Sequence, residues 1–286
     1  MKVAFIGLGA MGFPMAGYVS KAAYSVQVFN RTTNTANLWK DQYSGSSHPT
    51  PGSTATDADF VLLCVGNDND VRSVVYGEDG VLASMKANSV LIDHTTTSAE
   101  LAKELYQACK EKDIKFLDAP VSGGQAGAEN GKLTVMIGGE QGVYDAAKPI
   151  LDCYSQKHAL MGDAGAGQLC KMVNQICIAG VVQGLSEALH FAKNANLDVA
   201  NVIDVISKGA AQSWQMENRW STMHNNEFDF GFAVDWMRKD LAIVLDEAKQ
   251  NGSTLPITAL VDQFYALVQK NGGGRHDTSS LITLLK

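Results

Sequence analysis

The stretch VAFIGLGAMGFPMAGYVS, from Val3 to Ser20, places three glycines within six residues. A short apolar run, typical of a buried strand, ends at Ile6, and a helical pattern follows the last glycine. Gly7, Gly9 and Gly12 thus form a G-x-G-x-x-G turn between a strand and a helix. The first glycine of such a turn allows a tight bend, the second lets a pyrophosphate approach the backbone, and the third lets the helix pack closely on the strand.

This turn predicts a dinucleotide site, because phosphates bind to the N–H groups at the N-terminus of the helix. A purely structural glycine turn is the alternative. A P-loop is excluded, since no Gly-Lys-Ser/Thr follows the glycines. We expect the cofactor to contact every residue of the turn, namely Gly7, Leu8, Gly9, Ala10, Met11 and Gly12.

Short apolar runs recur through the first half of the chain and are typical of strands buried on both faces. They lie at Val3–Ile6, Ser25–Phe29, Asp59–Val65, Ser89–Asp93, Ile114–Leu117 and Leu133–Ile137. Helical patterns lie between several of them, at Gly12–Ala22, Asn69–Val75 and Ser98–Lys112. This alternation predicts an α/β fold of the Rossmann type, with a doubly wound parallel sheet.

The pattern changes after about Gly162, where strand signals end and helical periodicity continues to the C-terminus. Helices are predicted at Gly165–Asn194, Val199–Ser207, Trp236–Gln250 and Pro256–Lys270. Pro256 suits the first turn of a helix. We therefore expect two domains: a nucleotide-binding Rossmann domain over residues 1–163 and an all-helical domain over residues 164–286.

Composition excludes several classes of function. The 286 residues carry a net charge of −7, which disfavours nucleic acid as the main partner. No uninterrupted apolar run reaches the length of a membrane span, and the N-terminus does not resemble a signal peptide. Five cysteines without a C-x-x-C pair indicate reduced thiols in a cytoplasmic protein. The histidine spacing indicates no metal site.

The end of the second predicted strand indicates which nicotinamide cofactor binds. An acidic residue there would bond the ribose 2′-hydroxyl of NAD, but this chain has Asn30, Arg31 and Thr32, and no acid before Asp41. Arg31 can pair with a 2′-phosphate, and Thr32 can donate a hydrogen bond to it. We expect NADP(H) in preference to NAD(H), with an incidental surface arginine as the alternative. Val65, at the end of the next strand, is also expected to contact the cofactor.

Three further stretches could carry chemistry. Ser122–Gly124 follows a predicted strand, and its backbone N–H groups suit a carboxylate. Lys171, Asn174 and Gln175 share one face of a predicted helix because they stand at i, i+3 and i+4. A lysine in these apolar surroundings either extends to the surface or is held in a cleft for acid/base work. Lys239 lies near the start of a late predicted helix and could reach a ligand, although a solvated helix face is the simpler interpretation.

Together these motifs resemble the β-hydroxyacid dehydrogenase family, which includes 3-hydroxyisobutyrate dehydrogenase, tartronate semialdehyde reductase and the glyoxylate/succinic semialdehyde reductases. The matching segments are FIGLGAMGFPMA (5–16), DAPVSGGQAGAENGKLTVMIGG (118–139), GAGQLCKMVNQ (165–175) and RKDL (238–241). The resemblance covers essentially the whole chain. It implies a Rossmann domain joined by a long helix to a helical domain, an active site in the cleft, and reversible hydride transfer between a nicotinamide and a small hydroxy acid or semialdehyde.

The resemblance also implies roles for single residues. Lys171 is the catalytic lysine, which exchanges a proton with the substrate oxygen, and Asn174 orients the substrate beside Gln175. The resemblance further implies that Ser122, Gly123 and Gly124 bind the substrate carboxylate. It also implies that Thr96 and Lys239 contact the nicotinamide. By analogy with the family, the chain forms a homodimer or homotetramer.

The chain departs from the family pattern at His94, where many members carry a small residue, and at Gln175, where several carry asparagine. Two other functions stay open. One is a nicotinamide-binding sensor without turnover, which has no need of Lys171. The other is an imine reductase, which Lys171 also disfavours because related imine reductases replace this lysine.

Overall fold

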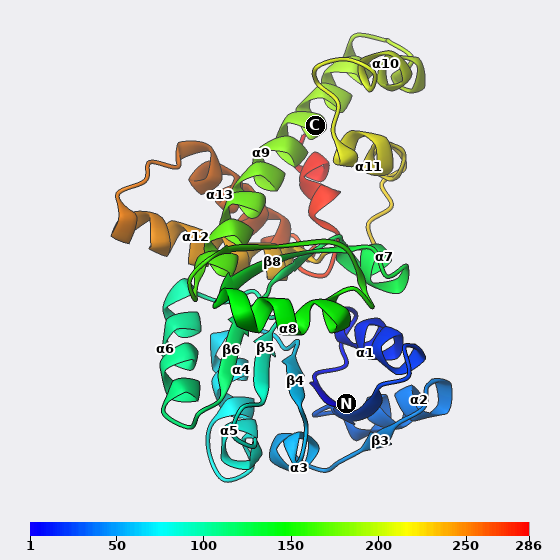
Figure 1. Ribbon diagram of the computed structural model, residues 1–286. Coiled ribbons are helices and arrows are strands. Elements are labelled where there is room, and N and C mark those ends of the chain that lie inside the picture. The colour runs from blue at the N-terminus through cyan, green and yellow to red at the C-terminus, as the bar shows by residue number, and fades with distance from the viewer. Residues whose placement is uncertain (286) are drawn as a thin grey trace. The chain divides into compact units, whose positions relative to one another are not determined.

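We describe residues 1–285 of a computed structural model of the chain. Contacts within the chain divide it into two compact units, the first formed by Met1–Lys171 and the second beginning at Met172 (Figure 1). The first unit contains a sheet covered by helices, and the second is built from helices. The predicted fold class is therefore confirmed.

The first unit is organised by a nine-stranded sheet with the order β3-β2-β1-β4-β5-β6-β8-β7, in which β9 also pairs with β8. The strands are β1 (Lys2–Ile6), β2 (Ser25–Phe29), β3 (Ser46–Ser47), β4 (Phe60–Leu63), β5 (Val90–Asp93), β6 (Lys115–Asp118), β7 (Val121–Ser122), β8 (Leu133–Gly139) and β9 (Ser155–Gly162). Strands β1 to β6 are parallel, as predicted. However, β8 is antiparallel to β6 and to β7. An apolar run records burial and not direction, so the sequence pattern could not show this reversal.

Eight helices accompany the sheet: α1 (Gly12–Lys21), α2 (Thr33–Gln42), α3 (Pro51–Ala55), α4 (Asp68–Val75), α5 (Val81–Ser84), α6 (Ala99–Lys110), α7 (Gly124–Glu129) and α8 (Gln141–Leu151). Successive residues of β1 point to opposite faces. Val3 and Phe5 pack in a hydrophobic cluster with α1, α2 and α8. Ala4 and Ile6 pack in a second cluster with α4, α5 and α6. Burial on both faces explains the continuous apolar runs.

The second unit contains α10 (Val199–Ile206), α11 (Trp214–Asn225), α12 (Val234–Asn251), α13 (Pro256–Lys270) and a 3₁₀ segment, η1 (Thr278–Leu284). The 29-residue helix α9 (Ala166–Asn194) begins in the first unit and continues into the second. By length and composition α9 could cross a membrane, but core helices of other proteins meet the same criterion. Its residues Ala179 and Val182 pack with α12 and α13, while Leu185 and Leu189 pack with α10 and α11. We therefore interpret α9 as a core helix.

Candidate active site

The parallel strands bring the predicted site residues of the first unit to one edge of the sheet. The register pairs Ile6 with Leu63, Leu63 with Asp93, and Asp93 with Asp118. The glycine turn follows β1, Val65 follows β4, and the threonines 95–97 follow β5. This is the edge at which open α/β sheets bind ligands.

The three glycines of the turn have three different environments. Gly7 has φ +95°, and a Cβ there would clash with the carbonyl oxygen of Cys64. A Cβ on Gly12 would clash with the Gly7 carbonyl, so α1 packs directly on the turn. In contrast, within residues 1–285 nothing lies within 4 Å of a Cβ built on Gly9. The fit of a dinucleotide rests on this contrast, because the backbone is open at the glycine that a pyrophosphate approaches.

Asn30, Arg31 and Thr32 lie where β2 ends and α2 begins. The Asn30 side chain supports the turn, since its Oδ1 accepts a hydrogen bond from Leu8 N–H at 2.9 Å. The Arg31 side chain is 89% exposed, and its Nη1 lies 3.5 Å from Asp70 Oδ1. Thr32 is the N-cap residue of α2. Arg31 can therefore reach an incoming phosphate, but Asp70 competes for it.

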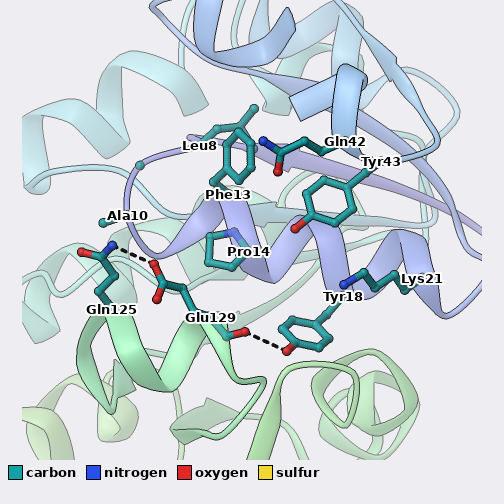
Figure 2. A pocket seen from close by; sticks show the side chains of 11 residues that line it. Leu8, Ala10, Phe13, Pro14, Tyr18, Lys21, Gln42, Tyr43, Gln125 and Glu129 are labelled. Atoms are coloured by element: carbon teal, nitrogen blue, oxygen red, sulfur yellow. Dashed lines mark hydrogen bonds between the residues drawn. The ribbon is translucent and has the colours of Figure 1, made fainter. Parts of the chain in front are cut away.

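A pocket of about 430 Å³ lies beside the glycine turn (Figure 2). Leu8, Gly9 and Ala10 form one wall, and α1 and α7 contribute others. Glu129 of α7 also lines the pocket, and its backbone carbonyl oxygen accepts a hydrogen bond from the Tyr18 hydroxyl at 2.8 Å. The pocket shows that the outer side of Gly9 and Ala10 is accessible.

The segment after β5 is built around buried polar groups. Asp93 Oδ1 accepts a hydrogen bond from Thr95 N–H at 2.9 Å, and Thr95 Oγ1 accepts one from Val65 N–H at 3.1 Å. Burial raises the pKa of Asp93 to about 7. Thr95 and Thr97 are buried, whereas Thr96 between them is only partly buried. The segment therefore presents the Thr96 side chain from a fixed backbone.

Ser122, Gly123 and Gly124 join β7 to α7. Ser122 pairs with Thr134 of β8, and the two glycines have positive φ values of +129° and +60°. Within the described residues, a Cβ on Gly124 would have no neighbour within 4 Å. The backbone of the turn is thus open at Gly124, whereas Gly123 packs against Leu133.

The first turn of α9 is fixed to the sheet by Asp118. Its Oδ1 accepts a hydrogen bond from Gly165 N–H at 2.7 Å, and its Oδ2 accepts one from Gln168 N–H at 2.9 Å. A carboxylate at a helix N-terminus satisfies N–H groups that the helix leaves without acceptors. Burial nevertheless raises the pKa of Asp118. Lys171 follows on the same helix and is only 7% exposed, so it is held inside the protein rather than extended to the surface.

In the second unit, α9 and α12 share a buried polar chain. Asn174 Nδ2 donates to Gln175 Oε1 at 2.7 Å, and Gln175 Nε2 donates to Asp240 Oδ2 at 2.7 Å. Lys239 Nζ lies 3.0 Å from Asp240 Oδ1, and Asp240 is 2% exposed. The structure thus connects the predicted residues Asn174, Gln175 and Lys239 through Asp240.

The sequence interpretation gave no site role to Asp70, Asp118, Gln168 or Asp240. Asp70 contacts the predicted Arg31, and Asp240 contacts the predicted Gln175 and Lys239. Asp118 bonds to Gln168, which in turn bonds to the backbone on either side of the predicted Thr96. Gln168 left a detectable signal. Together with Lys171 and Gln175 it forms a polar stripe at i, i+3 and i+7 of the helix, among apolar residues such as Leu169 and Met172. In the described part of the chain, no group of three or more His, Cys, Asp and Glu side chains is placed to hold a metal ion.

Comparison with known proteins places the chain in a family. Residues 2–162 match the NAD-binding domain of 6-phosphogluconate dehydrogenase, and residues 165–285 match the NAD-binding domain of NADP-dependent 3-hydroxyisobutyrate dehydrogenase.

Two similar relatives and one solved structure illustrate the match. An uncharacterized oxidoreductase of Shewanella frigidimarina is 60% identical, with 100% of this chain and 98% of the relative covered. A probable mitochondrial 3-hydroxyisobutyrate dehydrogenase-like protein of Arabidopsis thaliana is 37% identical, covering 100% of this chain and 85% of the relative. The structure of Mycobacterium tuberculosis 3-hydroxyisobutyrate dehydrogenase with L-serine superimposes with a TM-score of 0.91, at 28% identity over 100% and 99% of the two chains. The chain belongs to the β-hydroxyacid dehydrogenase family, whose members are nicotinamide-dependent oxidoreductases acting on hydroxy acids.

Proposed function

We propose that this protein is an NADPH-dependent reductase of a small carboxylated aldehyde, of the type of succinic, tartronate or methylmalonate semialdehyde or glyoxylate. The observation that carries the proposal is the buried position of Lys171 on the helix that also presents Asn174 and Gln175. A lysine held inside the protein suits proton transfer better than surface solvation. A protein that only binds a nicotinamide has no use for it.

In this proposal, the bound cofactor supplies the hydride that reaches the carbonyl carbon. Lys171 gives a proton to the carbonyl oxygen, so that a hydroxyl group forms, and takes the proton back in the oxidative direction. Asn174 donates a hydrogen bond to the substrate, with Gln175 supporting it. Ser122, Gly123 and Gly124 receive the substrate carboxylate through their backbone N–H groups.

The cofactor site is proposed to run along the residues at the carboxyl ends of the strands. The glycine turn Gly7–Gly12 receives the pyrophosphate, and Asn30, Arg31 and Thr32 favour the 2′-phosphate of NADP(H) over the hydroxyl of NAD(H). Val65, Thr96 and Lys239 are the further cofactor contacts. We assign most of the cofactor contacts to residues 1–163, with Lys239 as the exception. Residues 164–286 are assigned to substrate binding and oligomerisation, apart from the substrate carboxylate, which Ser122, Gly123 and Gly124 of the first domain receive.

We further propose that the protein is a cytoplasmic homodimer or homotetramer. Exposed apolar side chains on α9 and α13 support this assembly: Val173, Val181, Phe191, Ile257, Leu260 and Leu267. The two helices are adjacent, since a Cβ on Gly180 would lie 4.0 Å from Ile257 Cγ2. Light scattering after size-exclusion chromatography tests the assembly, and a monomer at micromolar concentration would contradict it.

The activity is tested by following oxidation of NADPH and, separately, of NADH with each of the four aldehydes. Turnover of one aldehyde with a clear preference for NADPH is the expected result. Binding of NADPH without turnover of any aldehyde would favour the sensor, and imines would then be offered to test for an imine reductase.

A further inference from the structure

Gln168 is completely buried near the predicted site, with 0% of its surface exposed. Both ends of its amide contact the backbone of the segment after β5. Its Oε1 accepts a hydrogen bond from Thr97 N–H at 3.0 Å, and its Nε2 donates one to the Thr95 carbonyl oxygen at 2.8 Å. The two bonds lie on either side of Thr96.

The other side of Gln168 is equally fixed. Its backbone N–H donates to the Asp118 carboxylate, which also accepts from Gly165 N–H, so β6 holds the start of α9. A Cβ on Gly167 would lie 2.5 Å from the Met136 carbonyl oxygen, which shows how closely this turn packs on the sheet. Lys171 lies about one helical turn further along α9, at i+3 on the same face of the helix.

We propose that Gln168 is a positioning residue that sets the placement of Thr96 relative to Lys171. The amide group acts as a clamp between two segments that are separated by more than 70 residues in sequence. Asp118 supports the clamp by holding the first turn of α9. This inference rests on the proposed function, in which Thr96 contacts the nicotinamide and Lys171 transfers the proton.

Only a group that donates at one end and accepts at the other satisfies both backbone partners. Methionine has a similar size but makes neither bond. An ionised glutamate at this position can still accept from Thr97 N–H. Its other oxygen would face the Thr95 carbonyl oxygen, and two acceptors cannot form a hydrogen bond. Protonated glutamate restores the donor, and burial together with the nearby Asp118 and Asp93 favours this form. The Gln168→Glu variant therefore makes the clamp dependent on pH.

The experiment compares Gln168→Met and Gln168→Glu with wild type, and uses Gln107→Glu as a matched control because Gln107 is exposed on α6. Hydrogen–deuterium exchange of residues 95–98 measures the clamp without requiring turnover. We expect the Thr97 amide to exchange about tenfold faster in Gln168→Met, in line with the loss of a buried hydrogen bond. We expect kcat to fall by about 10- to 100-fold, as misplacement of reacting groups would cause.

The pH profile separates positioning from a general loss of stability. For Gln168→Glu, the ratio of kcat/KM to the wild-type value should rise as the pH falls, whereas for Gln168→Met and Gln107→Glu it should be constant. A constant ratio for Gln168→Glu, or normal kcat in a Gln168→Met protein that has merely lost thermal stability, overturns the inference.

Two further measurements keep this inference separate from the proposed function. In the wild type, a Thr97 amide that exchanges as fast as exposed loop amides overturns the clamp even if no variant folds. If the wild type is inactive with every aldehyde, or Lys171→Ala retains turnover, the proposed function fails. The clamp is then tested by two properties of Gln168→Met: the exchange rate of the Thr97 amide and the affinity for NADPH. If neither differs from the wild type, the clamp is overturned.

Discussion

The imidazole of His94 and the hydroxyl of Tyr154 form a fully buried pair in which Nε2 lies 2.9 Å from the phenol oxygen. The opposite ring nitrogen, Nδ1, lies 2.7 Å from the Ala119 carbonyl oxygen. A carbonyl can only accept, so Nδ1 carries the proton and Nε2 accepts from Tyr154. The neutral ring thereby connects the end of β5 to the residue after β6. Burial keeps it neutral by lowering the pKa of His94 to about 4.

His94 and its neighbour Asp93 should affect stability against pH in opposite directions. Unfolded His94 binds a proton below about 6.5, but the folded group binds one only near 4, so its contribution to stability is lost as the pH falls through this window. Folded Asp93 keeps its proton up to about pH 7 while the unfolded group loses it near 3.8. Its contribution is therefore lost as the pH rises.

Urea denaturation at pH 4.5, 5.5 and 6.5 measures these contributions as differences from the wild type. Relative to the wild type, Asp93→Asn should make the slope of the unfolding free energy against pH more positive. His94→Asn should make the same slope more negative. Each slope should change by up to about 3 kcal/mol across the window. Parallel curves for wild type and both variants would show that neither group titrates differently in the folded state.

Replacement of Lys171 by alanine should remove turnover without removing cofactor. We expect kcat to fall by roughly 10²- to 10⁴-fold, which is the usual contribution of a general acid. The dissociation constant of NADPH, measured by fluorescence titration, should change by no more than a few-fold. Lys193→Ala is the control, since Lys193 is exposed at the far end of the same helix. A near-normal rate in Lys171→Ala would mean that another group donates the proton.

Arg31 should decide the preference for NADPH. Its contact with Asp70 is highly exposed, and such pairs contribute at most about 1 kcal/mol, so a phosphate can displace Asp70. Arg31→Ala should weaken NADPH by roughly tenfold or more and NADH hardly at all. Asp70→Asn should strengthen NADPH by a few-fold because it removes the competing carboxylate. Equal losses for both cofactors in Arg31→Ala would refute this account of specificity.

The parts of the fold that sequence predicts best are those whose burial is continuous. Runs such as Phe60–Leu63 are buried on both faces, and their strands begin and end within two residues of the predicted limits. In contrast, α2 was not predicted, because only Ala36 and Trp39 of its ten residues are buried. Strand β9 was missed for the same reason, since its exposed side chains give no alternation that a short window can detect.

The candidate site divides in a similar way. The G-x-G-x-x-G spacing lies within six consecutive residues, so a local pattern reveals the glycine turn, although Cys64 and Asn30 also contact it in the fold. The contacts of Gln168 with Thr95 and of Gln175 with Asp240 span 73 and 65 residues. Nothing in a local pattern specifies such partners. They depend on how the strands and helices pack, which only the folded structure supplies.

Asp240 should couple energetically to Gln175. Its carboxylate accepts the Gln175 amide at 2.7 Å and lies 3.0 Å from Lys239 Nζ, with almost no access to water. Removing one member of such a buried group leaves the others with unsatisfied polar atoms. We expect a double-mutant cycle of Gln175→Ala and Asp240→Ala to give a coupling energy of about 1–2 kcal/mol by urea denaturation.

The same cycle in kinetics tests whether the polar chain serves the substrate. Since Gln175 Oε1 accepts from Asn174, loss of Asp240 should free Gln175 to move and let Asn174 reorient. The KM for the aldehyde should therefore rise several-fold in Asp240→Ala while the affinity for NADPH is less affected. Lys249→Ala is the control on the same helix, because Lys249 is exposed and its effect should add to that of Gln175→Ala within about 0.5 kcal/mol. Additive effects for Asp240 and Gln175 would show instead that the buried chain has no energetic role.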